Sequence, residues 1–400
     1  MRLRSTERTY VIARTAFVSS YPPRRCGIAT FTRDLAAATG DREIAVLLPP
    51  GRGTPFPLEV HHRIRRDERA DYAATGRALG ACVEAVSLQF DYDTWGGDQG
   101  EYVFDLVEAL TVPAVATLHE IPRKPTPRQR KVLADLAASV DATVVMSQSA
   151  ATLLKKGYGV DPRRLNVIPH GVPDLPMADT AVIKASLGLE GRRVILSFGL
   201  LGPTKGHELM LEALPAVIEA NPDVTYVIVG VTHPDVLEAD GEAYRATLVA
   251  RVKALKLGGH VRFVDEFAHR VAMTRWLQAA DIVVTPYPDL DQTVSGTLSY
   301  AMGAGRAIVS TPYAYAAELL AGGRGILVPE PSPGPLAASL NKVLGDDKLR
   351  AALGRKAYDH SRNMVWSEVG AQYRALFQRV GAAASLGTRA APTGVAALNA

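Results

Sequence analysis

Residues that could bind an anion occur where an apolar stretch leads into a helix-patterned stretch. The first such segment, residues 19–30 (SSYPPRRCGIAT), places Gly27 at the start of the helical pattern. Backbone N–H groups at a helix start attract phosphate, and a glycine there permits close approach. Arg24 and Arg25 add positive charge nearby. Because the pattern is not the dinucleotide-binding G-x-G-x-x-G, a plain strand-to-helix turn remains an equal alternative.

A second loop, residues 199–206 (GLLGPTKG), begins at Gly199 and holds Lys205 next to another glycine. An ammonium group held on such a loop could stabilise the negative charge that develops on a leaving diphosphate. A solvent-exposed loop lysine is the simpler alternative. The loop predicts a place for phosphate chemistry only if other loops lie close to it.

A third loop, residues 292–297 (QTVSGT), runs into the helical pattern of residues 298–304. Ser295 is predicted to cap that helix, which leaves the N–H groups of Gly296 and Thr297 directed outward. The three loops lie far apart in the sequence, yet each one precedes a helix. Their convergence on one cleft would be more specific than any single loop.

Two histidines follow predicted strands directly. His119, in the segment TLHE, comes after the apolar stretch 114–118, at the end of a parallel strand where ligands bind. This position favours a substrate contact over a buried structural histidine. His170 has the same placement after residues 165–168, but Pro169 and Gly171 flank it, and a role in a turn is favoured.

Strand-length apolar stretches alternate with helix-patterned stretches twice along the chain, which predicts an α/β protein with two doubly wound parallel sheets. In the first half the predicted strands are 10–19, 43–48, 83–89, 114–118, 142–146 and 165–168, and the predicted helices are 30–38, 100–110, 126–139 and 150–156. In the second half the strands are 193–198, 224–229, 260–264, 281–285, 307–310 and 325–328. Two such halves imply a cleft between them, where ligands meet the carboxyl ends of both sheets.

The predicted boundaries give an N-terminal domain of residues 1–175 and a C-terminal domain of residues 176–362, joined through a proline-rich linker at 173–180 (PDLPMADT). A final helix over 363–380 is long enough to cross back onto the first domain. Residues 381–400 lack aromatic residues and periodicity and are expected to be disordered. The composition of 47% hydrophobic and 22% charged residues excludes a mostly disordered chain.

Net charge and hydropathy limit the classes of partner and the compartment that are expected for the protein. The net charge of +4 is too small for this length to indicate nucleic acid binding. No apolar run reaches the roughly 18 residues of a membrane span, no secretory signal is evident, and two cysteines fit a reducing compartment, so a cytoplasmic protein is expected. Basic residues cluster at 63–69 and at 123–131, and solvated helix faces are the main interpretation. For the second cluster the alternative is a peripheral contact with anionic lipid at the inner face of the plasma membrane, through Arg123, Lys124, Arg128, Arg130 and Lys131.

The motifs resemble, in this order, those of the GT-B glycosyltransferases of the large retaining family 4. The matching segments are YPPRRCGIATFTRDLA, TLHE, VVMSQSA, NVIPHGVP, SFGLLGPTKGHELMLEAL, ADIVVTPY and SGTLSYAMGAGRAIVSTP, and Trp366 lies in a region that resembles the family's crossover helix. The resemblance implies two Rossmann-like domains that face a cleft. It also implies transfer of a hexosyl group from a nucleoside-diphosphate sugar, GDP-mannose or a UDP-sugar, to a hydroxyl acceptor. The anomeric configuration would be retained, and no metal or other cofactor would be required.

Site roles follow from the same resemblance. It implies that Gly27 and Lys205 hold the diphosphate, that His119 contacts the donor sugar, and that N–H groups of the loop at 295–297 bind phosphate. Where the family usually has an arginine after Gly199 this chain has Leu200, so Lys205 is expected to share its task with Arg24, Arg25 or another basic residue. The base is expected to be read near Asp265 and Glu266. The sequence does not separate guanine from uracil.

Two departures from the family pattern fall at donor-binding positions. The family usually has two glutamates eight positions apart, where this chain has Gln292 and Tyr300. Gln292 can still hydrogen-bond a sugar hydroxyl, whereas Tyr300 can hold a ribose through one hydroxyl only. The missing carboxylates motivate an alternative, a catalytically silent GT-B partner that binds sugar nucleotide or glycan. Retention of Gly27, His119 and Lys205 favours catalysis, with His119, Lys205 and Gln292 as the catalytic group.

Two acidic pairs, at 91–93 (DYD) and 289–291 (DLD), resemble the carboxylates of a metal-dependent GT-A enzyme. Two Rossmann-like halves argue against that fold, and both pairs are better explained as loop residues. A nucleotide-sugar epimerase on the same fold is a further alternative, because a fold does not fix a function.

Overall fold

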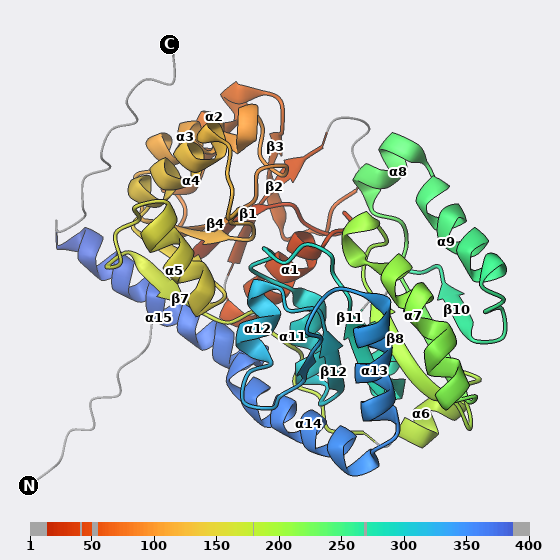
Figure 1. Ribbon diagram of the computed structural model, residues 1–400. Helices are drawn as coiled ribbons and strands as arrows, with labels where there is room; N and C mark the ends of the chain where they lie inside the picture. The colour runs from red at the N-terminus through yellow and green to blue at the C-terminus, as the bar shows by residue number, and fades with distance from the viewer. Residues whose placement is uncertain (1–13, 41, 50–54, 179, 268–269, 387–400) are drawn as a thin grey trace, which may run out of the picture.

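The computed structural model describes residues 14–40, 42–49, 55–178, 180–267 and 270–386 and shows two parallel sheets, each covered by helices (Figure 1). The N-terminal sheet has the strand order β3-β2-β1-β4-β5-β6-β7. Its strands are β1 (Thr15–Ser19), β2 (Arg42–Leu48), β3 (Val60–Arg65), β4 (Ala85–Phe90), β5 (Ala114–Leu118), β6 (Ala142–Val145) and β7 (Leu165–Val167). Its helices are α1 (Gly27–Thr39), α2 (Arg69–Gly80), α3 (Val103–Ala109), α4 (Pro127–Ser139) and α5 (Gln148–Gly157).

The C-terminal sheet has the order β10-β9-β8-β11-β12-β13. Its strands are β8 (Arg193–Phe198), β9 (Val224–Val229), β10 (Val261–Val264), β11 (Ile282–Thr285), β12 (Ala307–Ser310) and β13 (Ile326–Leu327). The helices that follow the linker are α6 (Thr180–Ser186), α7 (His207–Ala220), α8 (Pro234–Asp240), α9 (Ala243–Ala254), α10 (Arg270–Ala279), α11 (Gly296–Gly303), α12 (Ala314–Leu319), α13 (Pro333–Leu344), α14 (Asp347–His360) and α15 (Trp366–Ser385). The expected two-domain α/β architecture is confirmed.

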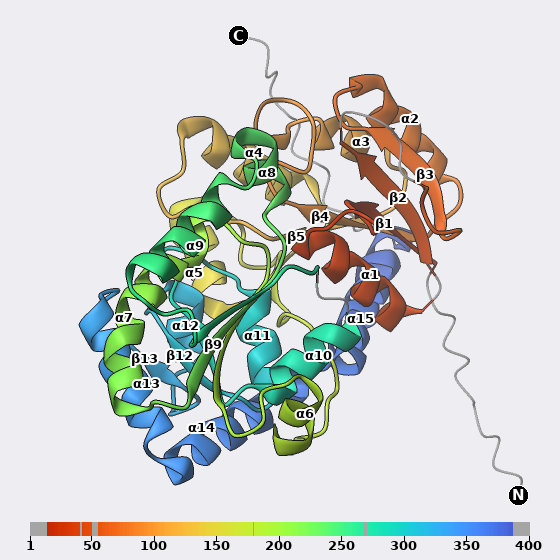
Figure 2. The same ribbon diagram turned by 90° about the vertical axis from the view of Figure 1, so that its right-hand side faces the viewer.

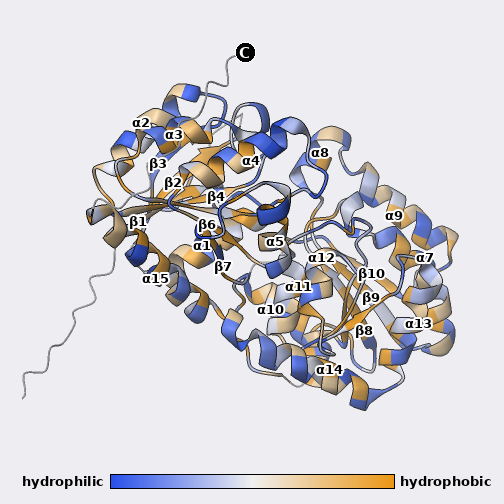
Figure 3. Cartoon of the chain, turned by 60° about the vertical axis from the view of Figure 1, so that its left-hand side comes forward, coloured by the Kyte–Doolittle hydropathy of each residue, from blue (hydrophilic) through white to orange (hydrophobic). Residues whose placement is uncertain are grey.

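The central strands are buried along their whole length, which explains why the sequence predicts them well. Every residue of β1, β4 and β5 is buried, as expected for parallel strands covered on both faces. Figure 3 shows orange, hydrophobic strands in the interior of both domains, beneath helices of mixed colour. Burial on both faces turns a strand into a continuous apolar run, which is the signal that the sequence carries.

The edge strand β3 (VHHRIR) is an element that the sequence analysis missed. Its exposure alternates, and only Ile64 is fully buried. Arg63 and Arg65 therefore lie on a strand, while Arg69 begins α2, so the interpretation of this basic cluster as a helix face is wrong. Polar and charged side chains are usual on edge strands, because they discourage pairing with other chains.

The two domains are joined by two chain segments that run side by side. Val172, the residue before the linker, donates its N–H to the Met364 carbonyl at 2.8 Å, and Trp366 donates its N–H to the Val172 carbonyl at 3.0 Å. Gly171 is required beside them, since a Cβ there would come within 2.3 Å of the Trp366 ring. The expected return of the chain to the first domain begins at this crossing.

Helix α15 then packs on the N-terminal domain (Figure 1, Figure 2). Its Tyr373 hydroxyl is hydrogen-bonded to Thr117 Oγ1 of β5 at 3.0 Å, and Phe377 meets Phe17 of β1 edge to face. The helix continues to Ser385, five residues beyond the predicted boundary at 380, so the first residues of the segment expected to be disordered are helical. Residues 387–400 of that segment, and residues 10–13 of the first predicted strand, lie outside the described residues. No helix in the described ranges is long and apolar enough to cross a membrane.

Candidate active site in the cleft between the domains

Two adjoining cavities lie between the domains. The smaller has a volume of about 300 Å³ and the larger about 630 Å³. Residues of both domains line each of them, and the lining residues that they share are Gly27, His170, Lys205, His233 and Gly296. The loops after β1, β8 and β11, which the sequence analysis predicts to converge, therefore meet in one cleft. This convergence is confirmed.

The N-terminus of α1 opens directly into the cleft. Cys26 caps this helix, with its Sγ accepting the Ala29 N–H at 3.3 Å, and Gly27 is the first helical residue. A Cβ on Gly27 would meet no other atom within 4 Å, so the protein itself does not require a glycine here. The missing side chain leaves space for a ligand beside a helix end that carries partial positive charge.

The N-terminus of α11 opens into the same cleft from the other domain. Ser295 caps it as predicted, with its Oγ accepting the Leu298 N–H at 3.2 Å. Gly296 and Thr297 line the smaller cavity, and the Thr297 hydroxyl donates to the Phe198 carbonyl at 3.3 Å. Ser295 itself is buried and lines neither cavity, so its contribution is to end the helix in the right place.

Lys205 is held at the junction of the two cavities by a sharp turn. Gly206 follows it with φ of +65°, and a Cβ there would lie 1.9 Å from the Pro286 carbonyl oxygen, so only glycine fits. The Lys205 Nζ lies 4.6 Å from the centre of the Tyr287 ring. Within the described part of the chain no carboxylate pairs with Lys205. Its ammonium group is therefore available to an anionic ligand.

Two histidines face the cleft as uncharged hydrogen-bond acceptors. Gln89 donates its amide to Ser87 Oγ, so its carbonyl accepts the Nε2–H of His119 at 2.8 Å. The Nδ1–H of His170 donates to the Gly171 carbonyl at 2.8 Å. These bonds assign the tautomers and leave His119 Nδ1 and His170 Nε2 with free lone pairs. Burial lowers the pKa of His119 to about 3 and that of His170 to about 4, so both rings are neutral at physiological pH.

His170 is the residue that the sequence analysis undervalued. It lines both cavities, and a Cβ on Gly296 would lie 3.1 Å from its Nε2. The ring of Phe31 holds both histidines edge to face, with centroids 4.9 Å from His119 and 5.1 Å from His170. The signal was present in the sequence, because His170 follows β7 as His119 follows β5. Because Pro169 and Gly171 flank His170, the sequence favoured a role in a turn instead.

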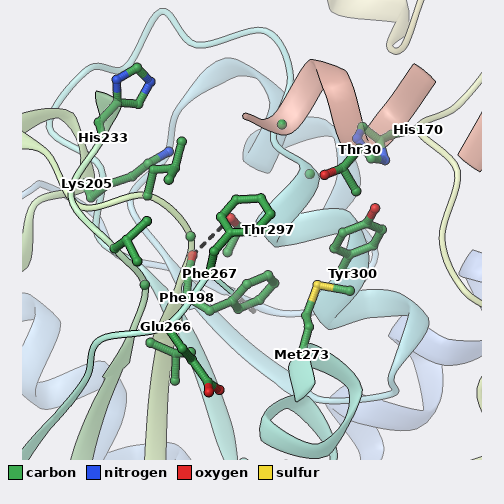
Figure 4. Close-up of a pocket in the computed structure, with 17 residues that line it drawn as sticks. Thr30, His170, Phe198, Lys205, His233, Glu266, Phe267, Met273, Thr297 and Tyr300 are labelled. Carbon is green, nitrogen blue, oxygen red and sulfur yellow. Dashed lines mark hydrogen bonds between the residues drawn. The ribbon is translucent and has the colours of Figure 1, made fainter. Parts of the chain in front are cut away.

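The two positions that lack the family's glutamates lie in different cavities. Gln292 lines the larger one, and its amide donates to the Val294 carbonyl at 2.7 Å. Tyr300 lines the smaller one and is 8% exposed, with its hydroxyl directed toward Thr30 and His170 (Figure 4). Burial and the nearby charge of Asp34 raise the pKa of the Tyr300 hydroxyl, which therefore stays protonated.

The side chains of Phe198, Phe267 and Met273 give the smaller cavity an apolar wall (Figure 4). Gly199 also lines this cavity, and a Cβ on it would lie 3.5 Å from Thr297 Oγ1. Glu266 lies there and accepts the Trp276 Nε1–H at 3.1 Å. Asp265, which the sequence analysis selects for base recognition, lines neither cavity. Its carboxylate is exposed and pairs with Arg245 at 2.8 Å.

The two arginines next to Gly27 also point elsewhere. Arg25 is exposed and lines neither cavity. Arg24 lines a separate cavity of about 440 Å³, together with Asp93 and Asp235. Because neither guanidinium lines the cavities beside Lys205, the loop contributes its helix N-terminus to the cleft and not its positive side chains.

The larger cavity is rich in carboxylates from both domains: Asp91, Glu120, Asp289 and Asp291. Partial shielding from water, together with the negative charges of Asp91, Asp93 and Asp289, raises the pKa of Glu120 to about 7. The acidic pairs are loop residues, as expected, and Asp91, Asp289 and Asp291 face the cleft, whereas Asp93 lines the separate cavity beside Arg24. Among the described residues, no three His, Cys, Asp or Glu side chains are placed to hold a metal ion.

The second basic cluster makes contacts within the protein. Arg123 and Lys124 line the larger cavity, and Arg123 reaches across to Asp291 of the other domain at 3.4 Å. On α4, Arg128 pairs with Glu101, and Lys131 pairs with Asp135 at 2.7 Å. Arg130 lies over the Tyr158 ring at 5.4 Å. Four of the five basic residues therefore have a partner within the protein, and the contact with anionic lipid stays a prediction.

Comparisons with known protein families agree with this architecture. The profile described as Glycosyltransferase Family 4 matches residues 26–174, and the profile described as Glycosyl transferases group 1 matches residues 179–360. The two matches together extend over both domains and meet at the linker.

Several named proteins are similar to this chain. A phosphatidyl-myo-inositol mannosyltransferase of Mycolicibacterium smegmatis is 29% identical over 283 residues, which cover 69% of this chain and 68% of the relative. A GDP-mannose-dependent monoacylated alpha-(1-6)-phosphatidylinositol monomannoside mannosyltransferase of Corynebacterium glutamicum is 24% identical, over 90% of this chain and 96% of its own. Among solved structures, Anabaena HepE in complex with UDP and glucose has a TM-score of 0.74 at 17% identity, covering 92% of this chain and all of HepE. HepE and this chain share the same fold.

Proposed function

Because the chain belongs to the group 1 glycosyl transferases, family 4, with the GT-B fold, we propose that it is a retaining hexosyltransferase. The donor is a nucleoside-diphosphate sugar, GDP-mannose or a UDP-sugar, and the acceptor is a hydroxyl group. The name of the Corynebacterium relative includes GDP-mannose, and HepE was solved with UDP and glucose, which supports a donor of this class.

One observation carries the proposal. Lys205 and the N-termini of α1 and α11 meet at the junction of the two cavities, and all three stabilise negative charge there. A diphosphate bound at this junction would extend its nucleoside into the smaller cavity and its sugar toward the larger one. The smaller cavity, with about 300 Å³, is within the size range of sites for small ligands.

The neutral histidines fit the sugar end of such a donor. His119 and His170 both offer a lone pair where sugar hydroxyls would lie, and hydroxyl groups donate to such acceptors. Gln292 is directed to the Val294 carbonyl through its amide nitrogen, which leaves its carbonyl oxygen for another hydroxyl. We assign these three residues to positioning of the transferred sugar.

The chemical step follows from this arrangement. The bond between the anomeric carbon and the diphosphate oxygen breaks, and its electron pair goes to the diphosphate, where Lys205 and the helix N-termini stabilise the added charge. The acceptor oxygen forms its bond on the same face of the sugar, and its proton passes to an oxygen of the leaving diphosphate. Neither a protein nucleophile nor a metal ion is part of this proposal. The facing domains exclude water, which would otherwise hydrolyse the donor.

A transfer assay tests the proposal. The protein is incubated with GDP-mannose, UDP-glucose or UDP-GlcNAc and a panel of hydroxyl acceptors, nucleoside diphosphate release is measured, and the product anomer is assigned by NMR. One donor is expected to turn over and to give a product of unchanged anomeric configuration. An inverted product would contradict the retaining mechanism. Binding of a nucleotide sugar without hydrolysis or transfer would favour the silent partner that the missing glutamates suggest.

A further inference from the structure

Tyr300 occupies a place in the smaller cavity that the donor's pentose would reach. It lies four residues after Gly296 on α11, and residues four apart share one face of a helix, one turn apart. A diphosphate at the helix N-terminus therefore leaves its pentose next to Tyr300, on the way to the apolar wall of the cavity. This position rests on the proposed function, because it requires a nucleoside diphosphate at Lys205.

In dinucleotide-binding folds a carboxylate accepts the hydrogen bond of the ribose 2′-hydroxyl and so recognises it. Among the residues that line the smaller cavity, the one carboxylate is Glu266, and its Oε1 already accepts the Trp276 Nε1–H. In Figure 4 the Glu266 carboxylate points away from the Tyr300 hydroxyl. Asp34, whose charge acts on the Tyr300 hydroxyl, does not line the cavity and is paired with Arg33. Among the described residues, no carboxylate therefore faces the pentose position from inside the cavity beside Tyr300.

The polar groups that remain are neutral. The Tyr300 hydroxyl has no hydrogen-bond partner within the described ranges and can bond one hydroxyl of a pentose. The hydroxyl protons of Thr30 and Thr297 are engaged by the carbonyls of Cys26 and Phe198. Loss of one neutral hydrogen bond weakens binding by up to about tenfold, whereas loss of a bond to a charged acceptor costs about tenfold to a hundredfold.

We propose that the smaller cavity distinguishes ribose from 2′-deoxyribose only weakly, by no more than the one neutral hydrogen bond that Tyr300 can supply. The enzyme then accepts 2′-deoxynucleoside diphosphate sugars, of which thymidine diphosphate sugars are one class, as well as the ribonucleotide forms. Tyr300 is the residue that sets this tolerance, because it supplies a single neutral hydroxyl where a carboxylate would read the 2′-hydroxyl.

Paired nucleotides test this inference. Dissociation constants are measured by calorimetry for UDP and dUDP, and for GDP and dGDP, with the full-length protein. For the base that binds, the two constants are expected to agree within about tenfold, the most that one neutral hydrogen bond supplies. A ribonucleotide preference above about tenfold would overturn the inference while leaving the proposed function intact. Absence of binding by every diphosphate would overturn both.

Variants at this position sharpen the result. Tyr300→Phe is expected to weaken both members of a pair by the same factor, and Glu266→Gln is expected to leave the ratio unchanged. Tyr300→Glu is expected to create a ribonucleotide preference of about tenfold or more. A folded Tyr300→Glu protein with the wild-type ratio would place the pentose elsewhere and contradict the assignment. If this variant fails to fold, the wild-type ratio alone decides.

Discussion

The two cavities of the cleft adjoin each other but differ in chemistry. Among the described residues, the smaller is lined mainly by apolar side chains and glycines with a single carboxylate, Glu266. The larger is lined by four carboxylates and by the basic residues Arg123, Lys124 and Lys205, from both domains. Lys205 and two helix N-termini lie where they meet. The two cavities are therefore suited to different parts of a ligand. In the proposed function, the smaller cavity would select the nucleoside by shape, the larger one would select the sugar and acceptor by charge and hydrogen bonding, and the junction would bind the phosphate.

Removal of the ammonium group at the junction is expected to have the largest effect. Lys205→Ala should reduce kcat by about a hundredfold or more, because the leaving diphosphate loses its charged partner. Steady-state kinetics with the preferred donor measure this. Lys155→Ala, on the exposed face of α5, is the matched control and should retain wild-type kcat. An unchanged kcat in Lys205→Ala would remove this residue from the site.

A side chain added at Gly27, the first residue of α1, is expected to weaken ligand binding without lowering the stability of the fold. Gly27→Leu should leave the melting temperature within about 2 °C of wild type, because a Cβ there meets no protein atom within 4 Å. It should weaken nucleoside diphosphate binding by about tenfold or more, since the new side chain occupies the junction. Gly258→Leu is the control, because its Cβ also meets no atom within 4 Å and it lies outside both cavities. Unchanged affinity in Gly27→Leu would show that the diphosphate lies elsewhere.

The smallest predicted effect concerns Glu120, one of the carboxylates that line the larger cavity. The pKa of Glu120 is raised from 4.5 to about 7, so the folded state binds more protons than the unfolded state between these values. The contribution of Glu120 to stability therefore falls as the pH rises through this window. The melting temperature of wild type minus that of Glu120→Gln should decrease between pH 4.5 and pH 7. A difference that is constant across this range would mean that Glu120 does not titrate among its acidic neighbours.

The sequence predicted the fold where burial made the pattern simple. The strands at Ala114–Leu118, Arg193–Phe198 and Val224–Val229 have the predicted bounds, because burial gives an uninterrupted apolar run between polar ends. The edge strand β3 was missed, since its exposed face carries His and Arg and breaks that run. The segment predicted to be disordered begins at residue 381, inside α15, for a related reason. The last residues of that helix are small and give no periodic signal.

The site was predictable to the extent that it depends on chain position. Loops after parallel strands meet at one edge of a sheet, and this rule located Gly27, Lys205 and the loop at 295–297. The direction of each side chain depends on packing that a sequence does not show. Asp265 turns to Arg245, whereas its neighbour Glu266 lines the cavity. His170 is directed into the cleft by the bond of its other nitrogen to the Gly171 carbonyl.

A crystal structure of the protein with a nucleoside diphosphate tests the central claim most directly. The account predicts the β-phosphate within hydrogen-bonding distance of Lys205 Nζ and of the Gly296 or Thr297 N–H, with the nucleoside in the smaller cavity. A nucleotide bound in the larger cavity against Arg123 and Lys124, with the smaller cavity free of nucleotide, would contradict it.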